Sequence, residues 1–136
     1  MLNKIIFAID DDTDTHVVAK FMRHIDTMRA LGELKGSFIP CIGCYDGMLE
    51  SSYMMDERDY RRFVEPMGFT DQQDCILHVP ADTRQPCTIE WNKFGDLECW
   101  NNTKTIGAMR SVTAAEAMQL RDWTYVIETN TYWSTS

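Results

Sequence analysis

The dipeptide Asp46-Gly47 constrains the fold of this 136-residue chain more than any other feature. Both residues accept the positive φ angles that a two-residue β-turn requires. An Asp-Gly pair between two apolar runs is the strongest short signal for a β-hairpin. We therefore predict one strand over residues 37–45 and its partner strand over residues 48–55.

A two-residue turn also fixes the register of the two strands, with Tyr45 opposite Met48. Gly43 then lies opposite Glu50. Because side chains alternate along a strand, Tyr45, Glu50 and Ser52 share one face. Tyr45 and Glu50 occupy diagonal positions about 7 Å apart at the backbone, within reach of long side chains. A carboxylate beside a phenol on a sheet face is a candidate site for chemistry.

Three further acids compete with Glu50 for a functional role. Glutamate is disfavoured inside a strand, so both Glu50 and Glu90 are candidates for a functional role. The alternative to a functional role for Glu50 is a structural one, at a half-exposed strand position paired with Lys or Arg. Asp56 and Glu57 have the alternative role of charges at the start of a helix. Four tryptophans and five tyrosines suit stacking on a base and cation–π contact, or a place in the core.

The elements around the hairpin predict the fold class. Residues 4–9 form an apolar run typical of a buried strand, and residues 16–31 carry apolar side chains at the spacing of one helix face. The segment 56–59, with three acidic residues and one arginine, opens a second helix, and residues 74–79 predict another strand. The resulting order, βαββαβ, predicts an α+β, ferredoxin-like fold, in which both helices cover one face of an antiparallel sheet.

We predict a single domain over residues 1–136, with a ferredoxin-like βαββαβ core over 1–80 and a C-terminal β/α extension over 81–136. The other face of the sheet must be covered by the extension, by another subunit or by a ligand. The polar tail from residue 129 is expected to be frayed. The elements expected in the extension are strands over 87–91, 97–100 and 124–128, a turn over 92–96, and a helix from a capping box at 113–116 to about residue 120.

The net charge of −8 disfavours non-specific binding to nucleic acid, for which basic patches are expected. Three interpretations remain: a soluble surface, a site for a cationic ligand, or a surface that imitates the charge of DNA. No apolar run reaches the roughly 18 residues of a membrane helix, and the amino terminus is typical of a strand rather than a signal peptide. We expect a cytoplasmic protein with no membrane partner.

The five cysteines do not have the spacing of a structural zinc site. Cys41 and Cys44 have C-x-x-C spacing, but Cys75, Cys87 and Cys99 lie too far apart to supply a second close pair. Cys41 and Cys44 would also point to opposite faces of a strand. We therefore expect reduced, buried thiols and no metal.

Four short segments resemble one known family. They are GCY at 43–45, SS at 51–52, DE at 56–57 and QDCIL at 73–77. In this order and spacing, over roughly residues 40–90, they are similar to the phage-encoded S-adenosylmethionine-cleaving enzymes. These enzymes are known as SAM hydrolases or SAMases and are now regarded as SAM lyases.

The resemblance implies a reaction and a setting. Such enzymes look like ferredoxin-like domains assembled as homotrimers, with active sites where subunits meet. They convert S-adenosylmethionine (SAM) to 5'-methylthioadenosine and homoserine lactone, or homoserine, by attack of the substrate carboxylate on its own γ-carbon. No cofactor and no metal are needed. They act in the cytoplasm of an infected bacterium, where loss of SAM counters restriction, and a host methionine adenosyltransferase is a further implied partner.

The resemblance also gives the acids roles. Tyr45 and Glu50 are assigned to the reacting centre. The ribose hydroxyls or the amino group fall to Glu90 or, alternatively, to Glu57. The candidate residues are thus Tyr45 and Glu50 for catalysis and Glu90, Glu57, Cys44 and Gly43 for substrate binding.

Two functions from other classes remain as alternatives. An acidic protein could counter restriction without catalysis by imitating DNA, although 13 Lys and Arg residues count against this. A binding module could instead sequester a small nucleotide or a host protein. Incubation with SAM separates these alternatives, because only the enzyme forms methylthioadenosine.

Overall fold

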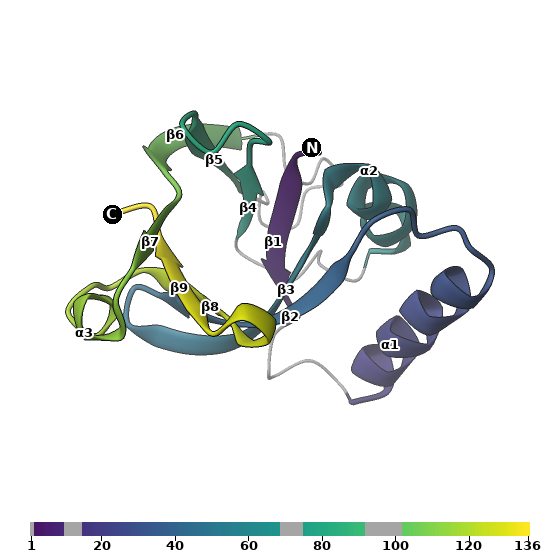
Figure 1. Cartoon of the computed structure of the whole chain (residues 1–136). Coiled ribbons are helices and arrows are strands. Elements are labelled where there is room, and N and C mark those ends of the chain that lie inside the picture. The colour runs from purple at the N-terminus through teal and green to yellow at the C-terminus, as the bar shows by residue number, and fades with distance from the viewer. Residues whose placement is uncertain (1, 10–14, 69–74, 92–101) are drawn as a thin grey trace.

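The computed structural model describes residues 2–9, 15–68, 75–91 and 102–136 (Figure 1). No helix among these residues is long and apolar enough to cross a membrane. The elements in chain order are β1 (Lys4–Ala8), α1 (Thr15–Ala30), β2 (Phe38–Tyr45), β3 (Met48–Asp56), α2 (Glu57–Asp59) with its π-helical and 3-10 continuations η1 (Tyr60–Val64) and η2 (Glu65–Met67), β4 (Cys75–Val79), β5 (Pro86–Trp91), β6 (Asn102–Ala108), β7 (Arg110–Val112), α3 (Ala114–Ala117), β8 (Trp123–Val126), the 3-10 turn η3 (Ile127–Thr129) and β9 (Thr131–Ser134).

The described strands form one antiparallel sheet in the order β6-β5-β4-β1-β3-β2-β8-β9-β7. Its two edges are β6 and β7, which are separated along the chain by Met109 alone. One residue can join opposite edges only if the sheet curls until they approach. Figure 1 shows such a nearly closed barrel. At the closure, a Cβ atom on Gly107 would collide with the carbonyl oxygen of Thr135.

The predicted ferredoxin-like fold is wrong. The strands that follow residue 81 do not form a separate extension beside a four-stranded sheet. Instead β5 and β6 continue the sheet beyond β4, and β8, β9 and β7 continue it beyond β2. The sequence pattern identifies strands but does not state which strand pairs with an open edge, and pairing at both edges satisfies the backbone groups that those edges expose.

The main core lies between the helices and the outer face of the barrel. Phe21 and Ile25 of α1 are fully buried, as are Tyr60 and Val64 in the helical segment after β3. The ring of Phe7 in β1 lies 5.9 Å from that of Phe21 and 5.2 Å from that of Tyr60. Because neighbouring residues on a strand point to opposite faces, the same strands have a second set of side chains directed into the barrel.

The predicted central hairpin is confirmed. Asp46 and Gly47 form the turn, with φ angles of 50° and 80°. Strand β2 begins one residue later than predicted, at Phe38, and β3 ends one residue later than predicted, at Asp56. The register is the predicted one, with the pairs Tyr45–Met48 and Gly43–Glu50.

The predicted helix starts have mixed outcomes. The capping box of Thr113 and Glu116 is confirmed, although the helix ends earlier than predicted, at Ala117. Asp56 occupies the N-cap position of α2, but its side chain does not cap the helix. Its carboxylate instead forms an ion pair with Lys4 of the neighbouring strand β1.

The prediction of a frayed tail is wrong, since β9 pairs with β8 on one side and with β7 on the other. Tyr132 and Trp133 therefore sit within the sheet, where aromatic residues are favoured. The predicted strand over 97–100 and the turn over 92–96 lie outside the described residues.

Candidate active site

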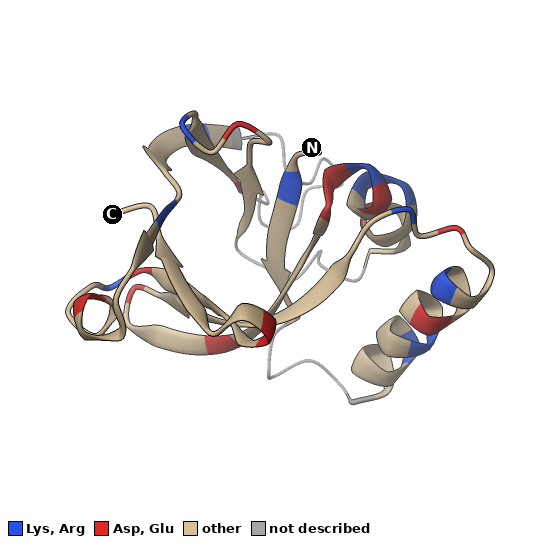
Figure 2. Cartoon of the chain, in the orientation of Figure 1, with Lys and Arg blue, Asp and Glu red and all other residues tan. Residues whose placement is uncertain are grey.

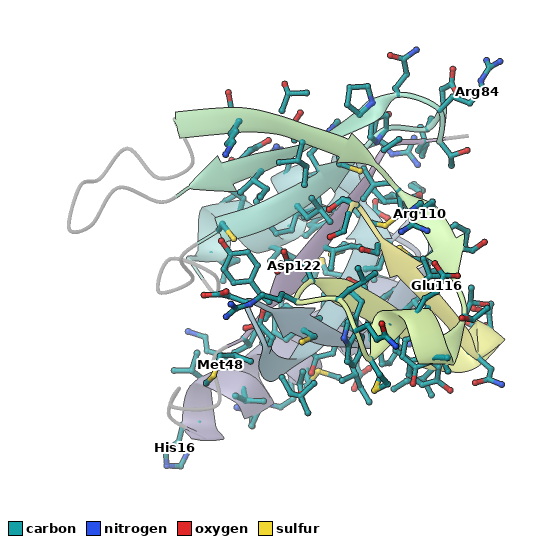
Figure 3. The ribbon with its side chains drawn as sticks, turned by 90° about the vertical axis from the view of Figure 1, so that its left-hand side faces the viewer. His16, Met48, Arg84, Arg110, Glu116 and Asp122 are labelled. Atoms are coloured by element: carbon teal, nitrogen blue, oxygen red, sulfur yellow. The ribbon has the colours of Figure 1, made fainter. Side chains whose placement is uncertain are left out.

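The interior of the barrel contains a pocket of about 410 Å³. A cavity of this size suits a small organic ligand. It is lined by residues of β1 to β6, β8 and β9 together with the segment that precedes β8. In Figure 3 Asp122, from that segment, lies in the centre of the view, and Met48, at the tip of the hairpin, lies toward the lower left.

One wall of the pocket is polar and comes from β2, β3 and β8. Glu50 is half-buried there, and Ser52 and Thr124 are buried. Gly43 lies between them, paired with Glu50 on one side and Thr124 on the other. A Cβ atom at Gly43 would lie 2.7 Å from Ser52 Oγ and 3.5 Å from Glu50 Cγ. Glycine at this position therefore leaves room for both side chains.

The other wall is largely apolar and comes from β1, β4, β5 and β6. Ile6 pairs with Leu77, and Leu77 pairs with Ile89. The row ends at Lys104, which pairs with Ile89 and has an exposed side chain. The pocket thus places polar groups across from an apolar surface with a cation at its rim.

Aromatic rings and a second carboxylate complete the lining. Trp133 pairs with Thr124, and Tyr45 lies on the hairpin with 45% of its surface exposed. Asp122 lines the pocket directly before β8, and its Oδ1 accepts a 2.8 Å hydrogen bond from the backbone N–H of Asp46. Carboxylates beside π-systems favour a ligand that carries positive charge.

The structure brings four of the predicted site residues together. Tyr45, Glu50, Gly43 and Cys44 all line this pocket. Asp122 was missed, although only Trp123 separates it from the predicted strand over 124–128. Recognising it requires the knowledge that β8 pairs with β2, and no local pattern in the sequence contains that information.

Glu57 and Glu90 do not line the pocket; they lie in a second cluster around Arg61. Glu90 follows Ile89 in β5, so the alternation that directs Ile89 into the barrel directs Glu90 outward. Arg61 Nη2 lies 2.5 Å from Glu90 Oε1 and 3.3 Å from Glu57 Oε2. His78 Nε2 lies 3.2 Å from the same Glu57 oxygen. Within this chain the two predicted binding acids are thus engaged with Arg61.

The charges in this cluster shift its pKa values. Burial opposes ionisation of Glu57, but the hydrogen bond from Asn3 and the contacts with His78 and Arg61 outweigh it and lower its pKa. Burial also opposes the charge of Arg61, whereas hydrogen bonds to Glu90 and to Glu65 raise its pKa. Glu57 and Arg61 are therefore both ionised at neutral pH.

For the cysteine thiols, burial is the largest effect, and it opposes ionisation. Burial raises the pKa of Cys41 to about 11 and also raises the pKa values of Cys44 and Cys87. Protonated thiols are poor nucleophiles and poor metal ligands. In the part of the chain that the structure describes, no group of three or more His, Cys, Asp or Glu residues could hold a metal ion.

Acidic and basic residues are interspersed along the helical segments α1 and α2 (Figure 2). A surface that imitates DNA needs a continuous acidic face. The mixed pattern on these elements does not support that alternative.

The curled antiparallel sheet surrounds a pocket lined by carboxylates and aromatic rings, a lining that suits a small cationic ligand. The sequence pattern of the S-Adenosylmethionine lyase family matches residues 13–136. The chain therefore belongs to the S-Adenosylmethionine lyase family, a family of enzymes, as the resemblance of the short segments implied. No curated protein matches the chain.

Proposed function

We propose that the protein cleaves SAM to 5'-methylthioadenosine and homoserine lactone. The α-carboxylate of the substrate attacks the γ-carbon, so an O–Cγ bond forms as the Cγ–S bond breaks. The electron pair of the broken bond stays on sulfur, and the sulfonium becomes a neutral thioether. No proton, oxidant or water enters this step, and homoserine arises only if the lactone later hydrolyses.

The pocket inside the barrel is the observation that carries this proposal. SAM has a permanent sulfonium charge, an ammonium group and a flat base. Glu50 and Asp122 supply negative charge, and Tyr45 and Trp133 supply aromatic surface. The apolar wall excludes water around the reacting atoms, which strengthens the electrostatic interactions there.

We assign Glu50 and Tyr45 to the reacting centre. Intramolecular displacement requires a folded methionine chain, and a carboxylate near the sulfonium holds that near-attack geometry. A tyrosine hydroxyl can donate to a carboxylate, which keeps the acid ionised and oriented. Cys44 and Gly43 contribute the shape of the polar wall, where Gly43 has no side chain to fill the space.

A homotrimer with active sites between subunits extends the proposal to Glu57 and Glu90. The hairpin exposes three apolar side chains, with 38% of the surface of Ile42, 73% of Met48 and 64% of Leu49 accessible to solvent. Exposed apolar surface of this kind favours burial against another subunit. In such an assembly, the acids around Arg61 of a neighbouring subunit could approach the pocket mouth. Light scattering should give three times the chain mass, and a monomer at micromolar concentration would contradict this arrangement.

The test of the reaction is incubation with SAM in ¹⁸O-labelled water, with chromatography and mass spectrometry of rapidly quenched samples. We expect methylthioadenosine together with unlabelled lactone as the first product. Label in homoserine from the earliest time, without lactone, would show hydrolysis instead. Retention of SAM at one molecule per site without products would show a sequestering module. In a bacterium, expression of the active protein should lower the SAM pool, which is the basis of the proposed anti-restriction role.

A further inference from the structure

Asp122 is a carboxylate of the pocket to which neither the sequence patterns nor the family resemblance assigns a role. It is half-buried and lies just before β8. The pairing of β2 with β8 ends at Cys44 opposite Trp123. One step further in this register places Asp122 across from Tyr45, on the inner face of the barrel.

The contacts of Asp122 fix its carboxylate. Its Oδ1 accepts the 2.8 Å hydrogen bond from Asp46 N–H, and the backbone carbonyl of Asp122 accepts from Ser134 Oγ at 2.8 Å. The neighbouring Arg121 pairs with Asp46, at 2.7 Å, rather than with Asp122. The carboxylate of Asp122 is therefore oriented by one neutral donor, the N–H of Asp46, and its backbone is held by Ser134. Among the described residues its partner is not a cation, so the carboxylate can face a positively charged ligand.

The geometry of the sheet separates Asp122 from Glu50. The two residues belong to opposite sides of β2, so the backbones of β3 and β8 are about 10 Å apart. Gly43 lies between these strands and has no side chain to fill the gap. The pocket thus has two carboxylates that approach one space from two sides.

SAM also carries two positive groups, the sulfonium and the ammonium, which are separated by three carbon atoms. The two differ in chemistry, because the ammonium has three hydrogen-bond donors and the sulfonium has none. A short, oriented carboxylate suits a hydrogen-bond donor. Glu50 approaches the same space from the other side of β2, where it can face the second positive group.

We propose that Asp122 binds the α-ammonium group of the substrate, while Glu50 faces the sulfonium. This inference rests on the proposed function and adds a residue that recognises the amino acid part of SAM. Binding of the ammonium by Asp122 anchors one end of the methionine chain, so that the α-carboxylate can turn toward the γ-carbon.

The experiment uses two non-cleavable ligands that differ only in the amino group: S-adenosylhomocysteine and its deaminated counterpart. Their dissociation constants are measured by calorimetry for the wild type and for Asp122→Asn, in which the amide oxygen can still accept from Asp46 N–H. The wild type should prefer the amino ligand by about ten- to a hundredfold, as expected for a hydrogen bond to a charged group. Asp122→Asn should bind the two ligands nearly alike.

Because the result is a ratio within each protein, a general loosening of the hairpin weakens both ligands and leaves the preference unchanged. An unchanged preference in Asp122→Asn, or no preference in the wild type, overturns this inference but leaves SAM cleavage intact. Failure of the wild type to convert SAM overturns the proposed function as well. Glu128→Gln removes one charge at an exposed position after β8 and should keep the wild-type preference.

Discussion

The substitution Glu50→Gln tests the central assignment with little change in shape. Glu50 lies within the pocket wall, and a Cβ at Gly43 would be only 3.5 Å from its Cγ. Space at this point is limited, and glutamine keeps the volume of glutamate while removing the charge. The side chain is half-buried, so the fold should remain intact. Any loss of activity then reports the charge.

The size of the effect follows from the distance at which the charge acts. A carboxylate about 5 Å from a sulfonium gains about 3 kcal/mol at an effective dielectric constant of about 20. Part of this attraction is lost at the transition state, because the positive charge on sulfur falls as its bond to carbon breaks. We therefore expect kcat/KM to fall by about a hundredfold, the lower end of the range for one preorganised electrostatic group.

The assay follows methylthioadenosine by chromatography over a range of SAM concentrations, and thermal unfolding checks that each variant is folded. Glu128→Gln, at an exposed position, is the control for loss of one charge. Near-full activity in Glu50→Gln, with loss of activity in Glu57→Gln or Glu90→Gln, would refute the assignment. It would place the chemistry at the cluster around Arg61.

Three further predictions concern the hydroxyl of Tyr45, the closure of the barrel and the acid cluster. Tyr45→Phe should lower kcat/KM less than Glu50→Gln, and steady-state kinetics should find the double variant no worse than Glu50→Gln alone; full additivity would contradict cooperation of the two groups. Gly107→Ala should lower the free energy of unfolding in urea by about 1–3 kcal/mol through overpacking against Thr135, and unchanged stability would argue against that contact. The lowered pKa of Glu57 lies below its unfolded value, so its ionised form stabilises the fold above about pH 4.3 and this contribution is lost as the pH falls through the lowered pKa. Stability measured against pH should therefore depend less on acidification in Glu57→Gln than in the wild type, and an equal dependence in both proteins would contradict this.

The features that sequence reasoning predicted correctly depend on neighbours in the chain. The turn at Asp46-Gly47 requires only two residues that tolerate positive φ, and this turn alone fixes that Gly43 faces Glu50. The capping box at residues 113–116 is likewise complete within four positions. Such signals survive folding because their partners are already present locally.

The features that sequence reasoning missed depend on pairing between distant segments. Asp122 belongs to the pocket only because β8 pairs with β2, and Glu90 leaves it because Ile89 faces inward. The curl of the sheet depends on Met109 joining its two edges. Alternation in a strand predicts two faces but does not identify which is inside, and the choice follows from the whole strand order.

The closure of the barrel has a consequence for how the enzyme is made. The pocket wall joins Ile6, near the start of the chain, to Trp133, near its end. Contacts of such long sequence separation form late and slowly in folding, because a large loop must close first. A chain emerging from the ribosome can form the β2–β3 hairpin early, but it cannot assemble the pocket until β9 has been synthesised. Catalytic competence should therefore appear in a single late step of cotranslational folding, and partly synthesised chains should leave the SAM pool untouched.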